Sequence, residues 1–205
     1  MKKIQIGDKI DIFYYIDNTK ILDQASITYL DKDTIYTCGH CFPKNAKTNY
    51  GKLVYSSGFD TKSEKEEIAI IKIKKDKLPY FKHLNISNDY YHDNNINTIL
   101  INNRKAYKGK ILMKVENKLK SGWQNINKKI SLNNQITKLE PPYYLVQANN
   151  LIKNQGLSGS PWLVYQDNTI KLLGGHIGRT EGQDNLGNNL EIIYVKPVNN
   201  NFYTK

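Results

Sequence analysis

Short strand-like runs of apolar residues recur along the whole chain of 205 residues. Clusters of Gly, Asn, Asp and Lys separate these runs, and no apolar period of 3.6 residues persists beyond about two helical turns. Short strands with frequent turn signals are typical of an all-β sandwich or barrel. The pattern predicts strands at residues 10–16, 25–30, 34–37, 52–55, 68–73, 97–101, 109–115, 143–148, 161–165, 170–177 and 191–195.

A polar stretch at residues 85–97 indicates a connection between two halves of the chain. The length suffices for one large β domain or for two small subdomains that share an interface. The sequence shows no internal repeat, and residues 199–205 are compatible with a loose end or a short helix.

Lysine and arginine together number 30 against 19 acidic residues, which gives a formal net charge of +11. Such a charge attracts polyanions non-specifically. The basic residues are scattered singly and in pairs, so we interpret them as a solvated surface and expect no dedicated nucleic-acid site. No segment approaches the roughly 20 apolar residues of a membrane span, and we therefore expect no membrane partner.

The only cysteines are Cys38 and Cys41, too few for a disulfide framework. The first residues include two lysines but lack the apolar core of a signal peptide. These features predict a reducing setting, either cytoplasmic or virion-associated, with no disulfide.

The segment Gly-Leu-Ser-Gly-Ser-Pro at residues 156–161 predicts a tight turn that enters a buried strand. Such a turn can present the hydroxyl of Ser158 while its amides converge on one point, as acyl transfer requires. A serine between glycines is also common in flexible linkers. The interpretation therefore depends on a base and an orienting carboxylate elsewhere in the chain.

His40 is the histidine best placed to act as that base, because it follows a predicted strand and has small neighbours. His83 and His92 lie in polar, lysine-rich surroundings that are typical of surface histidines. A packed histidine in a turn is one alternative for His40, and a metal or redox site with Cys38 and Cys41 is another. Two thiols and one histidine supply only three of the four ligands of a tetrahedral zinc site, and the four-residue segment 38–41 is too short to place all three around one ion. We therefore expect no metal and no cofactor.

Glu67 begins an Ile-rich strand at residues 67–73, whose burial would hold its carboxylate at a fixed place. A carboxylate that orients a catalytic imidazole must be held at a fixed position in this way. An ordinary charged loop is the alternative, and it suits the preceding acidic residues.

Three pieces in this order resemble the chymotrypsin-like peptidases. The chain reads Thr-Cys-Gly-His-Cys at 37–41, Glu-Ile-Ala-Ile-Ile at 67–71 and Gly-Leu-Ser-Gly-Ser-Pro at 156–161. The resemblance covers nearly the whole chain and implies two six-stranded antiparallel β-barrels with the active site in the cleft between them. Residues 1–88 would carry the histidine and the acid, and residues 89–205 the serine, the oxyanion hole and the S1 pocket.

The resemblance implies a serine endopeptidase. Ser158 would be the nucleophile, His40 the general base and then acid, and Glu67 the residue that orients the imidazole. The backbone N–H groups of Gly156 and Ser158 would form the oxyanion hole, and glycine suits the backbone angles required there.

Three features depart from the family pattern. An aspartate usually stands where Glu67 does, so a backbone or rotamer shift must accommodate the extra methylene; Glu66 and Asp60 are rival acids. Leu157 precedes the nucleophile, so activation by a freshly cut N-terminus is not expected. The usual disulfide partner of Cys41 is absent, which implies a free thiol.

The strand Gly-Gly-His-Ile-Gly at 174–178 resembles glutamyl endopeptidases and picornaviral cysteine proteases, whose matching histidine reads Glu or Gln at P1. The S1 pocket would then contain His176, Gly178 and Lys153. A lysine there favours a carboxylate through charge pairing. A packed structural histidine and a solvent-facing lysine are the alternatives.

We therefore expect a monomeric serine endopeptidase that acts on protein or peptide substrates and prefers Glu or Gln at P1. The main alternative is a catalytically impaired pseudopeptidase that serves as a basic binding or structural module. A plain nucleic-acid-binding β protein would leave three ordered motifs unexplained.

Overall fold

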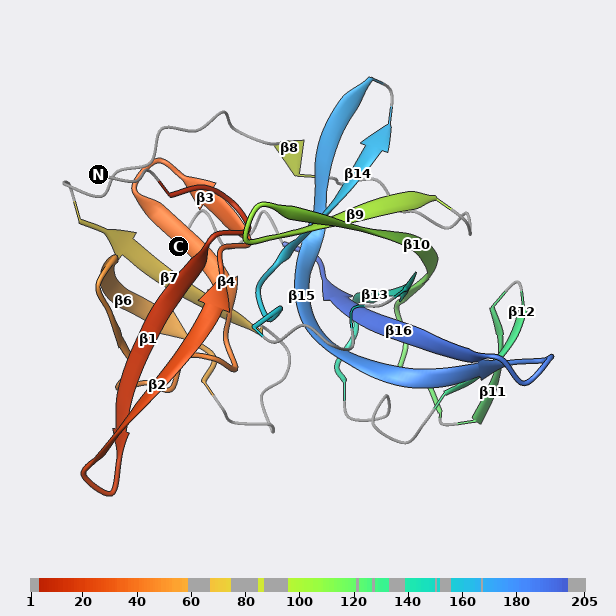
Figure 1. The fold of residues 1–205 in the computed structure, drawn as a ribbon, viewed down its shortest axis with the longest axis horizontal. Coiled ribbons are helices and arrows are strands. Elements are labelled where there is room, and N and C mark those ends of the chain that lie inside the picture. The colour runs from red at the N-terminus through yellow and green to blue at the C-terminus, as the bar shows by residue number, and fades with distance from the viewer. Residues whose placement is uncertain are drawn as a thin grey trace. The chain divides into compact units, whose positions relative to one another are not determined.

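The computed structural model describes residues 4–58, 67–74, 85–86, 96–120, 122–126, 128–132, 139–149, 151, 156–166 and 168–198 (Figure 1). These residues form β-strands joined by turns, with no helix among them. The prediction of an all-β protein is therefore confirmed. Within these ranges no helix exists that could cross a bilayer.

The chain folds into two compact units. The first comprises residues 1–84, 101–105 and 155–161, and the second comprises residues 85–100, 106–154 and 162–205. The segment around Ser158 thus packs with the first unit, whereas the sequence assigned it to the second domain. The physical reason is a backbone hydrogen bond of 2.8 Å from the amide of Ser26 to the carbonyl of Ser158. The predicted boundary between residues 88 and 89 lies outside the described residues.

The first unit contains one antiparallel sheet of seven strands in the order β2-β1-β5-β6-β7-β4-β3. Figure 1 shows β1 and β2 as a long hairpin. The strands are β1 (Lys9–Ile16), β2 (Thr19–Ser26), β3 (Tyr29–Asp31), β4 (Thr34–Cys38), β5 (Lys47–Thr48), β6 (Gly51–Ser56) and β7 (Ile68–Ile73).

Alternating burial along β1 explains how this sheet acquires its core. Ile10 and Ile12 are fully buried, and they pack with Ile35 and Ile71 from β4 and β7 in one apolar cluster. Burying each such side chain stabilises the fold by roughly 1.5–3 kcal/mol. All five residues of β4 are buried, so the turn that follows β4 leaves from a rigid strand.

The second unit contains a sheet of nine strands. Eight of them are hydrogen-bonded in the order β11-β12-β15-β14-β9-β10-β13-β16, and the ninth, β8, pairs with β15 in parallel. Its strands are β8 (Asn85–Ile86), β9 (Asn97–Asn102), β10 (Lys105–Val115), β11 (Gly122–Ile126), β12 (Lys128–Leu132), β13 (Tyr143–Ala148), β14 (Pro161–Gln166), β15 (Thr169–Asp184) and β16 (Asn189–Lys196). Trp162 is fully buried at the start of β14, next to Leu100 in β9.

Both sheets exceed the six strands expected from the sequence. The difference lies in the two-residue strands β5 and β8 and in the β11–β12 hairpin. Without these additions, six strands remain in each described sheet.

Candidate active site

Three side chains from distant parts of the chain form one hydrogen-bonded row within the first unit. His40 Nε2 lies 3.0 Å from Ser158 Oγ, and His40 Nδ1 lies 2.9 Å from Glu67 Oε2. The side chains of His40 and Glu67 are 31% and 15% exposed. The imidazole is therefore open to solvent on one side, while the carboxylate behind it is largely shielded.

The pairing of β4 with β7 places the histidine beside the acid. Cys38 is opposite Ile68 in this antiparallel ladder, so the residues just beyond the paired positions come together at the same end. Gly39 allows this approach, because a Cβ there would collide with the Ser57 hydroxyl and lie 2.7 Å from the amide nitrogen of Ile68. A hydrogen bond of 2.9 Å from the Phe42 amide to the Gly39 carbonyl closes the turn around the imidazole.

Glu67 has a left-handed backbone with φ of 40°. This region costs an L-residue with a Cβ about 1–2 kcal/mol, and strained backbone of this kind clusters at functional sites. It is at this residue that the backbone directs the carboxylate onto His40 Nδ1. The rival acids Glu66 and Asp60 lie outside the described residues.

The turn at Ser158 is held by its own backbone and by the first sheet. The amide of Ser160 donates to the carbonyl of Leu157 over 2.9 Å, and Gly156 and Gly159 have φ of 70° and 82°. Thr28 Oγ1 donates to the Gly159 carbonyl over 2.5 Å. Among the described residues, the amides of Gly156 and Ser158 donate no hydrogen bond.

A buried polar network that was not predicted from the sequence supports this turn. The side-chain amide of Asn102, at the end of β9, lies 2.8 Å from the hydroxyls of both Ser26 and Ser160 and 3.2 Å from the carbonyl of Gly156. The side chains of Asn102, Ser26 and Ser160 are almost fully buried. Asparagine is so frequent in this chain that residue type alone offered no signal for Asn102.

One of the two thiols beside the imidazole, Cys41, alters the charge of the ring. Burial disfavours the imidazolium, but hydrogen bonding and charge from Cys41 and then from Glu67 outweigh burial and raise the pKa of His40 to about 10. A hydrogen bond from Cys38 and the neighbouring imidazolium, against the effect of burial, lower the pKa of the Cys41 thiol to about 6. Burial raises the pKa of Cys38 well above its usual value. The neutral imidazole that a general base requires therefore becomes more abundant as the pH rises.

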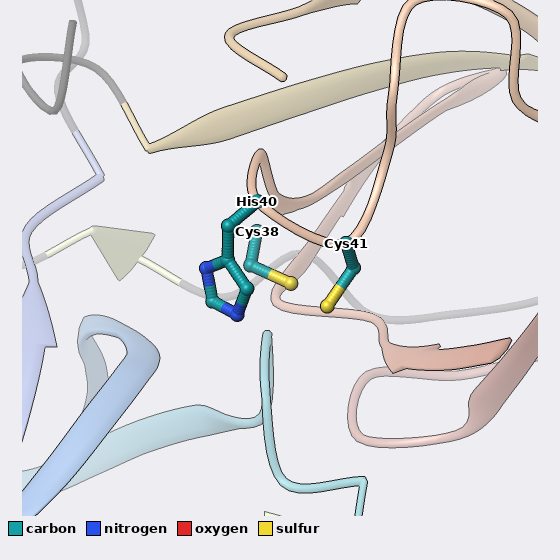
Figure 2. Close-up of side chains that lie close together, drawn as sticks. All are labelled: Cys38, His40 and Cys41. Atoms are coloured by element: carbon teal, nitrogen blue, oxygen red, sulfur yellow. The ribbon is translucent and has the colours of Figure 1, made fainter. Parts of the chain in front are cut away.

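The two cysteines are free thiols, and both are buried. One ligand atom from each of Cys38, His40 and Cys41 lies within 4.8 Å of the other two. Figure 2 shows the two sulfurs beside the imidazole ring. The expectation that this window is too cramped for three ligands is therefore wrong, because the turn after β4 folds their side chains toward one point.

The residues predicted for the S1 pocket fall in the second unit. His176 is 3% exposed in β15, opposite Val195 of β16. The register between these strands shifts at Ile177, and such a bulge re-aims neighbouring side chains. Gly178 is half-buried after this shift. Lys153 lies outside the described residues, as do His83 and His92.

The sequence matches no protein-family model and no curated protein. Solved structures of similar shape do exist. The Rv3671c protease of M. tuberculosis in its active form is 13% identical with a TM-score of 0.58, over 94% of this chain and 76% of that chain. Its inactive form is 15% identical with a TM-score of 0.53, over 93% and 83% of the two chains.

Tobacco etch virus protease in complex with product is 12% identical with a TM-score of 0.47, over 99% of this chain and 80% of that chain. The assignment of the fold rests on the mycobacterial protease, whose similarity is greater. The chain has the chymotrypsin-like fold that its motifs predict.

Proposed function

We propose that this chain is a serine endopeptidase. The observation that carries the proposal is the continuous row from Ser158 through His40 to Glu67, with hydrogen-bond distances of 3.0 and 2.9 Å. A nucleophile, a base and an orienting acid in this geometry are the constellation that acyl transfer uses on several unrelated folds. The likeness in fold to a bacterial protease is independent support.

In the proposed reaction, Ser158 Oγ attacks the scissile carbonyl carbon while His40 Nε2 takes the hydroxyl proton. Glu67 accepts a hydrogen bond from His40 Nδ1–H and stabilises the imidazolium that forms. The imidazolium then protonates the leaving amine, the C–N bond breaks and an acyl-enzyme remains. Water, deprotonated by the same imidazole, hydrolyses the ester and returns the proton to Ser158.

The amides of Gly156 and Ser158 are the proposed oxyanion donors. The left-handed backbone at Gly156 and the part-buried hydrogen bonds from Ser26 and Asn102 to its carbonyl fix the start of the turn that carries both amides. Donors that are oriented in advance stabilise the developing charge, and loss of one typically costs about 3 kcal/mol of transition-state stabilisation.

We further propose that the enzyme cleaves after acidic residues, Glu first and Gln second. The support is the resemblance of the strand around His176, the lysine at position 153 and the net charge of +11, which steers acidic substrates toward the protein. A library of peptides that varies only P1 tests this specificity. A preference for basic or large aromatic P1 residues would contradict it.

Labelling by a fluorophosphonate probe tests the nucleophile. The wild-type protein is expected to form one adduct, located on Ser158 by peptide mapping, and Ser158→Ala and His40→Ala are expected to lose it. The matched control is Cys38→Ser/Cys41→Ser, which should still label at Ser158 and so separates a serine nucleophile from a reactive thiol. A properly folded wild-type protein that forms no adduct would favour the pseudopeptidase.

A further inference from the structure

The cluster of Cys38, His40 and Cys41 has no role in the proposed reaction apart from the histidine itself. Its three ligand atoms lie within 4.8 Å of one another, and both thiols are buried. The thiols come from the end of β4 and from the turn after it, so all three ligands are attached to one short, well-held segment. Figure 2 shows the sulfurs of both cysteines close to the ring.

The donor set suits zinc. Zn²⁺ prefers thiolate sulfur and imidazole nitrogen at roughly 2.3 and 2.0 Å, in tetrahedral geometry, which places the ligand atoms about 3.5–3.8 Å apart. The observed limit of 4.8 Å therefore requires each ligand atom to move by about 1 Å or less. The spacing of two residues between Cys38 and Cys41 is also common in zinc sites.

The surroundings match a zinc-bound histidine. A metal-ligating imidazole usually donates its other N–H to a carboxylate, and Glu67 already holds Nδ1 at 2.9 Å. This leaves Nε2 as the metal ligand. Thr37 Oγ1 lies 3.9 Å from the Cys38 sulfur and supplies a polar neighbour to that ligand.

We propose that Cys38, His40 and Cys41 together bind one Zn²⁺ ion, and that the bound ion switches off the peptidase. The inhibitory part rests on the proposed function, whereas the binding part does not. Zinc on His40 Nε2 occupies the lone pair that would accept the proton of Ser158 and breaks the 3.0 Å hydrogen bond between them. A water molecule completes the tetrahedron, and two protons leave to solvent, one from the Cys38 thiol and one from the Cys41–His40 pair.

Direct metal binding is the first test, and it needs no activity. Reduced, metal-free full-length protein is titrated with Co²⁺, followed by absorption spectroscopy, and with Zn²⁺, followed by calorimetry. We expect one equivalent of each and a thiolate-to-cobalt charge-transfer band in the near ultraviolet. Cys38→Ser and Cys41→Ser should each weaken binding by about tenfold or more, and the double variant should lose the band.

Two variants serve as matched controls. Ser158→Ala cannot react but keeps all three ligands, so it should bind one equivalent with the same band. His176→Gln removes a histidine from the other unit and should also leave binding unchanged. Wild-type protein that lacks the charge-transfer band, or a double cysteine variant that binds as tightly as wild type, would overturn the site.

Activity then tests the switch. Stoichiometric zinc should abolish cleavage and fluorophosphonate labelling of the wild type, with recovery on chelation, whereas the double cysteine variant should retain activity at the same zinc concentration. Equal inhibition of both proteins would overturn the regulatory role. A metal-free protein that binds zinc as expected but never cleaves or labels would refute the proposed function and leave the zinc site standing.

Discussion

Gly159 provides the sharpest test of how the serine turn is built. Its backbone has φ of 82°, and a Cβ at this position would collide with the carbonyl oxygen of Ser26 and lie 2.5 Å from Thr37 Oγ1. Both neighbours are buried, and Thr37 Oγ1 donates to the Ser26 carbonyl over 2.6 Å. The substitution Gly159→Ala therefore combines left-handed strain with a collision that no flexible side-chain end can relieve.

The expected loss of stability follows from these contributions. The left-handed backbone costs about 1–2 kcal/mol once a Cβ is present. Overpacking a buried contact adds about 1–3 kcal/mol, and disturbance of the threonine hydrogen bond adds about 1 kcal/mol. We expect Gly159→Ala to lower the free energy of unfolding by about 3–6 kcal/mol, a large part of the roughly 5–15 kcal/mol typical of a folded protein.

Gly58→Ala is the matched control, because Gly58 lies in the same unit with φ of 71° and has open space where the added methyl group would lie. It should lose only the strain, about 1–2 kcal/mol. Urea denaturation followed by circular dichroism measures both variants, and peptide cleavage reports whether the turn survives. If Gly159→Ala and Gly58→Ala had free energies of unfolding within about 0.5 kcal/mol of each other, the collision at Gly159 would be absent, and the turn could not be packed against the first sheet as described.

Three further predictions concern the groups around the triad. Asn102→Ala should lower the free energy of unfolding by about 2–4 kcal/mol, since it removes the buried amide that the Ser26 and Ser160 hydroxyls and the Gly156 carbonyl share; urea denaturation measures this, and a change below about 0.5 kcal/mol would contradict it. Glu67→Gln should reduce kcat by about 10⁴ with an unchanged circular dichroism spectrum, because the amide can donate to His40 Nδ1 and hold the imidazole in the wrong tautomer; an unaltered kcat would show that the triad acid lies elsewhere. In chelator-treated enzyme, kcat/KM should rise with pH toward the pKa of His40, about 10. Cys41→Ser should shift this rise in kcat/KM to lower pH, because it removes the negative charge that raises the pKa of His40. An unshifted pH profile would contradict the interaction between Cys41 and His40.

Strands with an apolar face were predictable, and those without one were not. Residues 143–148 and 68–73 were placed correctly because buried side chains mark them. β2 escaped prediction along most of its length because its first six residues are exposed or only half-buried, so the sequence shows no alternation. The turn that joins β1 to β2 is formed by Asp17 and Asn18, both of which have a positive φ. This residue pair is a hairpin-turn signal in the sequence.

Sequence by itself determined the all-β class and the three motifs that contain Ser158, His40 and Glu67, because local residue type and order suffice to recognise them. Only the tertiary structure decided that the serine turn packs with the N-terminal unit, that Asn102 supports it and that two thiols converge on the imidazole. The physical reason is that these relations depend on backbone hydrogen bonds and close approaches between residues far apart in the chain, such as that from Ser26 to Ser158. No local pattern of hydrophobic and polar residues encodes such contacts.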